Sequence, residues 1–163
     1  MKLGKILVPL DGSTLAEAVL PRAVELANES GATVELLRAV EAHTIPGVDL
    51  TEAQIKVVEE GEAYLDEVRA GLKAEGIREV ETSVWYGPAA YAIVEAARLH
   101  KVDLIAMTTH GRSGLGRLIL GSVAESVLRG TTVPILLVRV AEAPVERPTG
   151  EGVAKPWPEI KYV

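Results

Sequence analysis

Residues 108–122 read TTHGRSGLGRLILGS, a glycine-rich loop between an apolar segment at 102–107 and an amphipathic segment at about 118–129. The first segment predicts a strand and the second a helix, so the loop joins the carboxyl end of a strand to the amino end of a helix. Backbone N–H groups lack partners at such a helix end, where the helix dipole is positive. Because glycines also let a phosphate approach the backbone closely, the stretch predicts an anion site and points to a nucleotide.

The composition of the chain limits the classes of protein that fit it. The chain has 163 residues, of which 48% are hydrophobic, and a formal net charge of −6. This length predicts one domain, and the absence of cysteine excludes a disulfide framework or a thiolate metal site. No apolar run approaches the roughly 20 residues of a membrane span. Residues 1–5 lead directly into a strand, so we expect no signal peptide and a cytoplasmic location, and the acidic charge argues against a nucleic-acid partner.

Five short apolar segments of the sequence predict β-strands. They lie at residues 6–10, 34–40, 80–85, 102–107 and 133–138. Helical patterns separate them, and this alternation predicts an α/β fold with an open, five-stranded parallel sheet and right-handed crossovers. We expect the strand order 3-2-1-4-5, with helices on both faces. The first and fourth strands are almost continuously apolar, which is typical of strands covered on both faces, whereas the third and fifth should lie at the edges.

Four amphipathic segments predict the helices. The boundaries that we expect are Ser13 or Thr14 to Gly31 with a kink at Pro21, 51–74 with Thr51 as the cap, a start at Pro88, and 118–129. These elements place one domain at residues 1–140. Residues 141–163 are rich in proline and glycine, which predicts a tail rather than a second domain.

The fifth strand is apolar although it ends the sheet. An uncovered apolar edge invites pairing with another chain. We therefore expect a homodimer that is joined through this strand. The residues of the expected interface are Val133, Pro134, Ile135, Leu136, Leu137 and Val138.

Two segments should meet at the carboxyl ends of the strands. In an open parallel sheet, ligands bind where the strand order reverses, here between the first and fourth strands. The first strand delivers Asp11 to that point, and the fourth delivers the glycine-rich loop. Asp11 can accept hydrogen bonds from a ribose hydroxyl or an adenine amine, or hold a metal near phosphates. The alternative is that Asp11 is a cap or turn residue of the first helix.

Several loop residues suit an anionic ligand. Gly111 and Gly121 permit close approach to the backbone, and Ser122 can donate its hydroxyl and its N–H to a phosphate. Arg112 can neutralise phosphate charge. The alternatives are a plain loop for the glycines and a helix cap for Ser122.

Sharper catalytic motifs are absent from the sequence. The loop lacks the lysine of a P-loop and the third glycine of a dinucleotide fingerprint, and there is no G-x-S-x-G nucleophile elbow. A phosphoacceptor domain would need an aspartate after the third strand and a lysine after the fifth, where Trp85 and Arg139 stand. His43 and His100 have no partner at metal-ligand spacing, and we expect both on the surface. The sequence supports binding better than turnover, so we expect no enzyme beyond a weak ATPase.

Three motifs together resemble the universal stress protein family. They are ILVPLDGS at 6–13, TTHGRSGLGRLILGSVAESVL at 108–128 and VPILLV at 133–138, in order and at family spacing over roughly residues 2–140. The resemblance implies a Rossmann-like fold of the adenine nucleotide alpha hydrolase type and a dimer through the last strand. It also implies a stress-linked regulatory or nucleotide-sensing role, with ATP as the ligand, Mg²⁺ as its companion, and at most slow hydrolysis.

The ATP-binding branch of that family carries G-x-x-G, nine further residues and then G-[ST]. Gly111, Gly121 and Ser122 match this pattern, whereas Thr108 stands in place of the first glycine. The resemblance implies that the ends of the first, second and fourth strands hold the adenosine and that loop backbone groups hold the phosphates. The residues so implied are Pro9, Leu10, Asp11, Val40, Met107, Thr108, Gly111, Arg112, Gly121, Ser122 and Val123.

Two other functions remain open at this point. A protein of the same fold that binds no nucleotide would act through its dimer surface and its tail, and Thr108 favours this alternative. An ATPase or nucleotidyl transferase would use Mg²⁺ on phosphates that Asp11 positions, and the missing lysine and general base oppose it. Identifying any co-purified nucleotide and titrating ATP would separate these functions.

Overall fold

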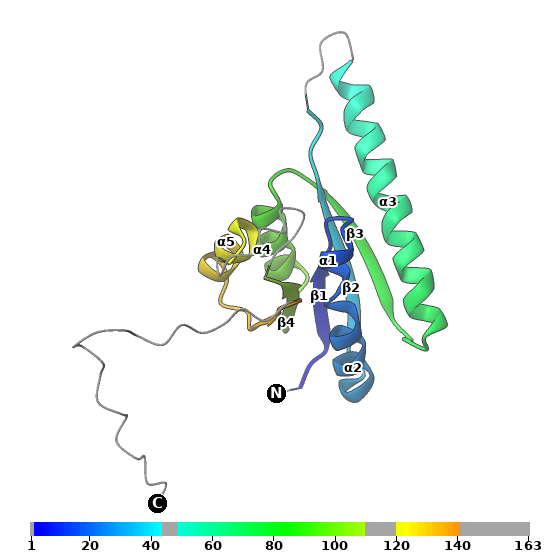
Figure 1. Ribbon diagram of the computed structural model, residues 1–163, viewed down its shortest axis with the longest axis vertical. Coiled ribbons are helices and arrows are strands. Elements are labelled where there is room, and N and C mark those ends of the chain that lie inside the picture. Colours follow the sequence, from blue (N-terminus) through cyan, green and yellow to red (C-terminus); the bar gives the residue numbers. More distant parts are fainter. Residues whose placement is uncertain (1, 44–48, 110–119, 141–163) are drawn as a thin grey trace, which may run out of the picture.

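The chain folds around one parallel β-sheet (Figure 1). A computed structural model describes residues 2–43, 49–109 and 120–140. Within these residues, five strands pair in the order β3-β2-β1-β4-β5, and every pair is parallel. The strands are β1 (Lys5–Pro9), β2 (Thr33–Val40), β3 (Val80–Tyr86), β4 (Leu104–Thr108) and β5 (Ile135–Val138). The predicted fold class and strand order are confirmed.

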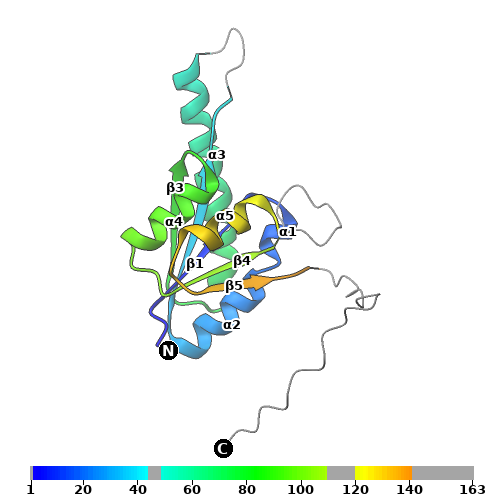
Figure 2. The same ribbon diagram turned by 90° about the vertical axis from the view of Figure 1, so that its left-hand side faces the viewer.

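Helices cover both faces of the sheet, as predicted. They are α1 (Thr14–Glu17), α2 (Leu20–Ser30), α3 (Leu50–Ala74), α4 (Ala89–Leu99) and α5 (Ser122–Gly130). Helices α1, α2 and α3 lie on one face, and α4 and α5 lie on the other (Figures 1 and 2). Helix α3 is long and extends beyond the sheet at its amino end (Figure 1).

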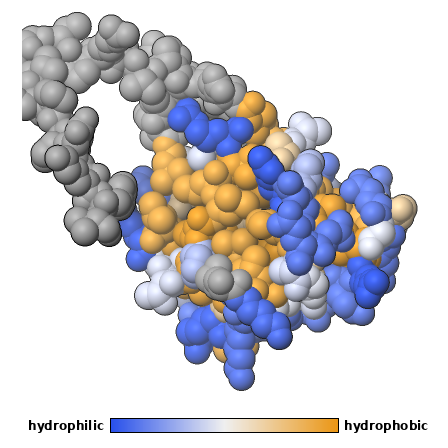
Figure 3. All heavy atoms as spheres, turned by 90° about the horizontal axis from the view of Figure 1, so that it is seen from below, coloured by the Kyte–Doolittle hydropathy of each residue, from blue (hydrophilic) through white to orange (hydrophobic). Residues whose placement is uncertain are grey.

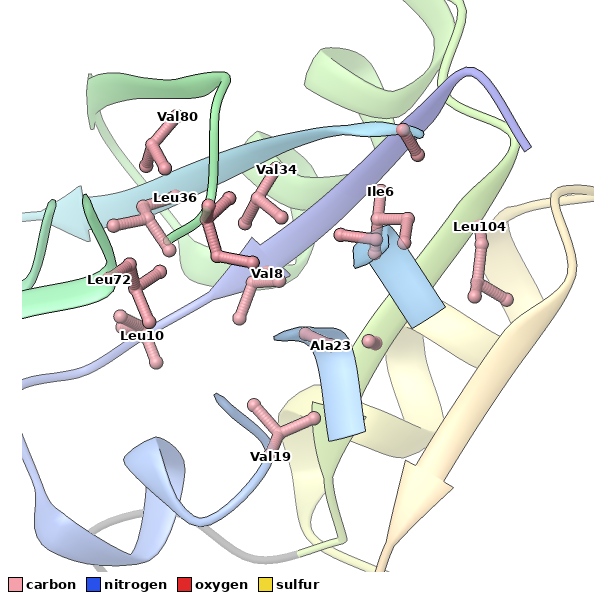
Figure 4. Packing of buried hydrophobic residues seen from close by; sticks show 14 of the residues in the cluster. Ile6, Val8, Leu10, Val19, Ala23, Val34, Leu36, Leu72, Val80 and Leu104 are labelled. Atoms are coloured by element: carbon pink, nitrogen blue, oxygen red, sulfur yellow. The ribbon is translucent and has the colours of Figure 1, made fainter. Parts of the chain in front are cut away.

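Strand β1 lies at the centre of the sheet and is buried on both faces. Ile6, Leu7 and Val8 have no exposed surface. Ile6 and Val8 pack with Val34 and Leu36 in the layer of α1, α2 and α3 (Figure 4), whereas Leu7 packs in the layer of α4 and α5. Full burial of one such side chain contributes about 1.5–3 kcal/mol, so the core holds the carboxyl end of β1 firmly in place.

The single kinked helix predicted from Ser13 to Gly31 is wrong. The chain forms two helices there, and Pro21 lies in the first turn of α2. Proline suits that turn because its missing N–H would have no helical partner and its φ is already helical. The two ends are as predicted: the Ser13 hydroxyl accepts a hydrogen bond from the N–H of Ala16, and Gly31 ends α2 in a left-handed conformation.

The cap predicted for the next helix is also wrong. Asp49, not Thr51, caps α3, because its carboxylate accepts hydrogen bonds from the N–H groups of Thr51 and Glu52. These bonds favour the ionised carboxylate and lower the pKa of Asp49. By contrast, Pro88 precedes α4 as predicted.

Two strands are shorter than predicted. Strand β4 begins at Leu104, and β5 begins at Ile135, so Val133 and Pro134 precede the strand to which they were assigned. The carbonyl of Pro134 still accepts a hydrogen bond from the N–H of Ile105 at 2.9 Å. Proline has no N–H to contribute to the ladder, which accounts for the late start of β5.

Part of the predicted organisation lies outside the described residues. Helix α5 begins at Ser122, later than the predicted residue 118, and residues 110–119 are not described. The tail predicted at 141–163 lies wholly outside the described residues, so the predicted domain boundary stays a prediction.

Candidate functional site

The sheet opens between β1 and β4 at the carboxyl ends of these strands. They pair no further than Leu7 with Ile105, whereas β1 pairs with β2 as far as Pro9 with Leu37. Strand β1 is followed by α1 on one face of the sheet, and β4 is followed by α5 on the other face. Ligands of open parallel sheets bind at such a switch point. A cavity of about 310 Å³ lies there, at the lower end of the size range of ligand sites.

Both of the predicted segments line this cavity. The lining residues are Pro9, Leu10, Asp11, Ala16, Leu37, Ala39, Ala89, Ile93, Met107, Thr108, Thr109, Gly121, Ser122, Val123 and Ala124. The β1–α1 loop and the junction of β4 with α5 are therefore brought together, although they are about a hundred residues apart in the sequence.

Asp11 lies on the cavity wall and is held by a turn. Its Oδ1 accepts hydrogen bonds from the N–H of Ser13 at 2.9 Å and from the Ser13 hydroxyl at 2.6 Å. Gly12, between them, has a φ of +82°, a conformation that favours glycine. Asp11 is thus a turn residue, as one alternative proposed, while Ser13 is the cap. The turn does not remove Asp11 from the cavity, because Asp11 is one of the lining residues.

The end of β4 and the start of α5 form another wall. Met107 and Thr108, each 6% exposed, are the last residues of β4. Gly121 is the N-cap of α5, and its N–H donates to the carbonyl of Thr109 at 2.8 Å, which ties the helix start to the strand end. Ser122 is the first helical residue, so the alternative that it caps the helix is wrong. The amino end of α5, with its positive dipole, lies at the cavity.

Sequence reasoning missed the apolar wall on the side of β2 and α4. Leu37 and Ala39 come from β2, and Ala89 and Ile93 come from the first turns of α4. A second helix amino end therefore lies at the cavity beside that of α5. The Gly-Pro pair that follows β3 was the available signal, because it marks a helix start at the same edge of the sheet.

Val40 is the described site residue that the structure places elsewhere. It is not a lining residue, and its Cγ1 lies 3.2 Å from where a Cβ atom at Gly61 of α3 would be, so its side chain packs toward α3. Successive side chains of a strand point to opposite faces, and Ala39 takes the position on the cavity side. Gly111 and Arg112 lie outside the described residues, and their role stays a prediction.

The described wall is mostly apolar and carries one charged side chain, that of Asp11. Thr108, Thr109 and Ser122 add hydroxyl groups on the side of β4 and α5. Such a wall suits a ligand with a flat apolar portion and polar groups at one end.

A second polar cluster lies at the amino ends of the strands, away from the cavity. Glu35 of β2 is 2% exposed and accepts a hydrogen bond from Ser83 at 3.0 Å. Its carboxylate also lies 2.7 Å from Nδ1 of His100 and 3.5 Å from Nζ of Lys5. Burial lowers the pKa of Lys5, but its hydrogen bond with Glu81 and the charges of Glu35 and Glu81 outweigh burial, and the pKa is raised. His100 is exposed, as predicted, and its Nδ1 contacts the buried carboxylate of Glu35.

Two kinds of feature are absent from the described residues. They contain no group of three His, Cys, Asp or Glu side chains that could hold a metal ion. The helices in this part of the chain include none with the length and apolarity needed to span a membrane. His43 is exposed, as predicted. The predicted part of Asp11 in holding Mg²⁺ depends on nucleotide phosphates and stays a prediction.

Known proteins resemble this chain over nearly all of the described residues. The sequence model of the Universal stress protein family matches residues 2–139. Universal stress protein MJ0531 of Methanocaldococcus jannaschii is 34% identical over 141 residues, which cover 83% of this chain and 81% of that protein.

Solved structures share the fold as well. The structure of the hypothetical protein MJ0577 superposes with a TM-score of 0.75 at 26% identity, covering 88% of this chain and 100% of the other. A universal stress protein in complex with cAMP superposes with a TM-score of 0.64 at 27% identity, covering 86% of this chain and 100% of the other.

Proposed function

This chain belongs to the universal stress protein family, and on that premise we propose that it binds an adenine nucleotide in the cavity between β1 and β4. The observation that carries the proposal is the meeting of the β1–α1 loop with the junction of β4 and α5 around that cavity. The complex of a structural relative with cAMP supports the choice of an adenine nucleotide. Two helix amino ends at one cavity favour an anionic ligand.

The walls of the cavity suggest how the nucleotide lies. The adenine ring packs against the apolar side chains of Leu37, Ile93 and Met107. The carboxylate of Asp11, on the cavity wall, accepts hydrogen bonds from ribose hydroxyls. The phosphates lie at the amino end of α5, near Ser122, where backbone N–H groups and the helix dipole favour negative charge.

We further propose that the protein holds its ligand rather than turning it over. ATP, accompanied by Mg²⁺, is the proposed natural ligand, and the protein acts in the cytoplasm as a stress-response regulator or nucleotide sensor. The support is chemical: the described wall offers one carboxylate and no lysine or histidine with which to stabilise or protonate a leaving group. Any hydrolysis is expected to be slow.

Identification of the bound nucleotide tests the proposal directly. The purified protein is extracted with acid, the released nucleotide is identified by chromatography, and ATP, ADP, AMP and cAMP are titrated calorimetrically with and without Mg²⁺. We expect saturable binding of at least one adenine nucleotide. No released nucleotide, together with no heat at millimolar ligand, would refute nucleotide binding and favour an interaction protein of the same fold.

We also propose that two chains form a homodimer through β5. This strand pairs on one side only, with β4, and all its residues are partly exposed although all are apolar. Apolar side chains gather on the lower side of the molecule, where β5 and α2 lie in Figure 2 (Figure 3). Pairing of two such edges would bury them. Analytical ultracentrifugation should show a dimer at micromolar concentration, and a monomer alone would refute the interface.

A further inference from the structure

Three side chains from three elements form a connected group behind the cavity wall. Arg38 comes from β2, Tyr64 from α3 and Glu17 from α1. The guanidinium carbon of Arg38 lies 5.0 Å from the centre of the Tyr64 ring, and the Tyr64 hydroxyl donates a hydrogen bond to Glu17 at 2.7 Å. We infer that this group, called the brace below, positions the β1–α1 loop for nucleotide binding. The inference rests on the proposed function, and none of the three side chains lines the cavity itself.

Arg38 lies directly against the turn that carries Asp11. A Cβ atom at Gly12 would lie 2.5 Å from Nη1 of Arg38 and 3.2 Å from its Cζ, so the turn and the guanidinium are in close contact. Nη1 is buried and makes no hydrogen bond with the described residues. The guanidinium therefore supports the turn by direct contact, and the Tyr64 ring, over which it lies, stabilises the cation.

Tyr64 holds the far end of the same loop. Helix α1 has only four residues, and one helical turn is not stable by itself, because fixing the turn costs more entropy than its hydrogen bonds return. It is held by the Ser13 cap at its amino end and by the bond from Tyr64 to Glu17 in its last turn. Ala16 of this helix lines the cavity. The position of this part of the cavity wall therefore depends on the bond between Tyr64 and Glu17, neither of which lines the cavity.

The hydroxyl of Tyr64 stays a donor over the physiological pH range. Burial raises its pKa, and the hydrogen bond to Glu17 and the charge of that carboxylate raise it further, while the charge of Arg38 lowers it. The hydroxyl therefore keeps the proton that it donates to Glu17 near neutral pH. Through this bond, the long helix α3 is linked to a loop of the proposed site.

Tyr64→Phe isolates the hydroxyl, because the ring beneath Arg38 is kept. Tyr91→Phe is the matched control, since Tyr91 is 65% exposed on α4. For each variant we would measure the dissociation constant of ATP and AMP by calorimetry and the hydrogen exchange of residues 11–17 without ligand. We expect Tyr64→Phe to weaken binding about three- to tenfold, the range given by the net contribution of one hydrogen bond. Exchange of residues 11–17 should rise, whereas Tyr91→Phe should change neither quantity.

Two further variants separate positioning from general stability. Glu17→Gln keeps an acceptor for the Tyr64 hydroxyl and should bind nucleotide nearly as wild type, whereas Glu17→Ala should match Tyr64→Phe. In a double-mutant cycle, Asp11→Asn should cost less affinity in the Tyr64→Phe background than in the wild type, because the loop is already displaced.

The outcomes distinguish this inference from the proposed function. If the wild type binds nucleotide and Tyr64→Phe binds equally well with unchanged exchange, the brace does not position the loop and the inference fails alone. Additive effects of Asp11→Asn and Tyr64→Phe would also overturn it. If the wild type binds no nucleotide at all, the proposed function fails and the inference falls with it.

Discussion

Replacing Gly12 with alanine tests how closely Arg38 supports the turn between β1 and α1. Gly12 has a φ of +82°, and an L residue pays roughly 1 kcal/mol more than glycine to adopt such a conformation. The new methyl group would also lie 2.5 Å from Nη1 of Arg38. The guanidinium must then move off the Tyr64 ring and lose a contact worth about 0.5–2 kcal/mol. We expect Gly12→Ala to lower the free energy of unfolding by about 2 kcal/mol in total.

Gly31→Ala is the matched control for this experiment. Gly31 has a φ of +72°, but nothing lies within 4 Å of a Cβ atom there, so only the conformational cost of about 1 kcal/mol applies. Urea denaturation followed by far-UV circular dichroism measures both variants. Adding Arg38→Ala to Gly12→Ala should recover the steric part, which gives a coupling of about 1 kcal/mol. Equal losses at the two glycines, or full additivity with Arg38→Ala, would refute the reasoning.

Four further predictions concern other parts of the molecule. Gly121→Val should abolish nucleotide binding in a folded protein, because its side chain would occupy phosphate space; its φ of −58° suits any residue, so calorimetry showing retained affinity would remove this position from the site. Leu136→Lys should shift the sedimentation profile from dimer to monomer, and an unchanged dimer would place the interface elsewhere. Lys5→Met should lower the free energy of urea unfolding by about 1–3 kcal/mol, because it leaves the buried carboxylate of Glu35 short of a cation, and an unaltered midpoint would contradict this. Backbone hydrogen bonds from residues 4 and 5 lower the pKa of Asp103, so the stability that they provide is present above about pH 4 and is lost as the pH falls through the lowered pKa. The free energy of unfolding of Asp103→Asn should therefore fall less steeply below about pH 4 than that of the wild type. The same pH dependence in both proteins would argue against these bonds.

The fold could be predicted from the sequence because its main signals are local. Runs of aliphatic residues mark the strands, and the two continuous runs belong to β1 and β4, which are interior in the sheet. Alternation of strands and helices then leaves few parallel topologies. The same logic located the cavity, since the carboxyl ends of β1 and β4 are fixed once the strand order is known.

What the sequence did not predict depends on contacts between distant elements. Successive residues of a strand point to opposite faces, so either Val40 or Ala39 can face the cavity, but not both. Because both residues are apolar, the sequence could not decide between them. Glu35 looked like one polar residue in an apolar strand, and its partners on β1, on β3 and directly after α4 are far from it in the sequence. Pro21 is compatible with both a kink and a helix start, and the structure has a helix start there.

In the proposed complex, the distribution of chemistry around the cavity would let its walls contact different parts of the nucleotide. Leu37, Ile93 and Met107 offer no side-chain donor or acceptor of useful strength, so a base lying against them is selected by shape and by main-chain groups. The charge and hydroxyl groups of Asp11 and Ser122 lie where the connections leave the sheet, which suits ribose and phosphate. Ligands that differ in the number of phosphates would then differ in their contacts with the start of α5, and ligands that differ in the base would differ in their contacts with β2 and α4. Since Asp11 is also the wall residue whose turn contacts Arg38, we propose that residues remote from the ligand alter its affinity through the contact between Asp11 and ribose.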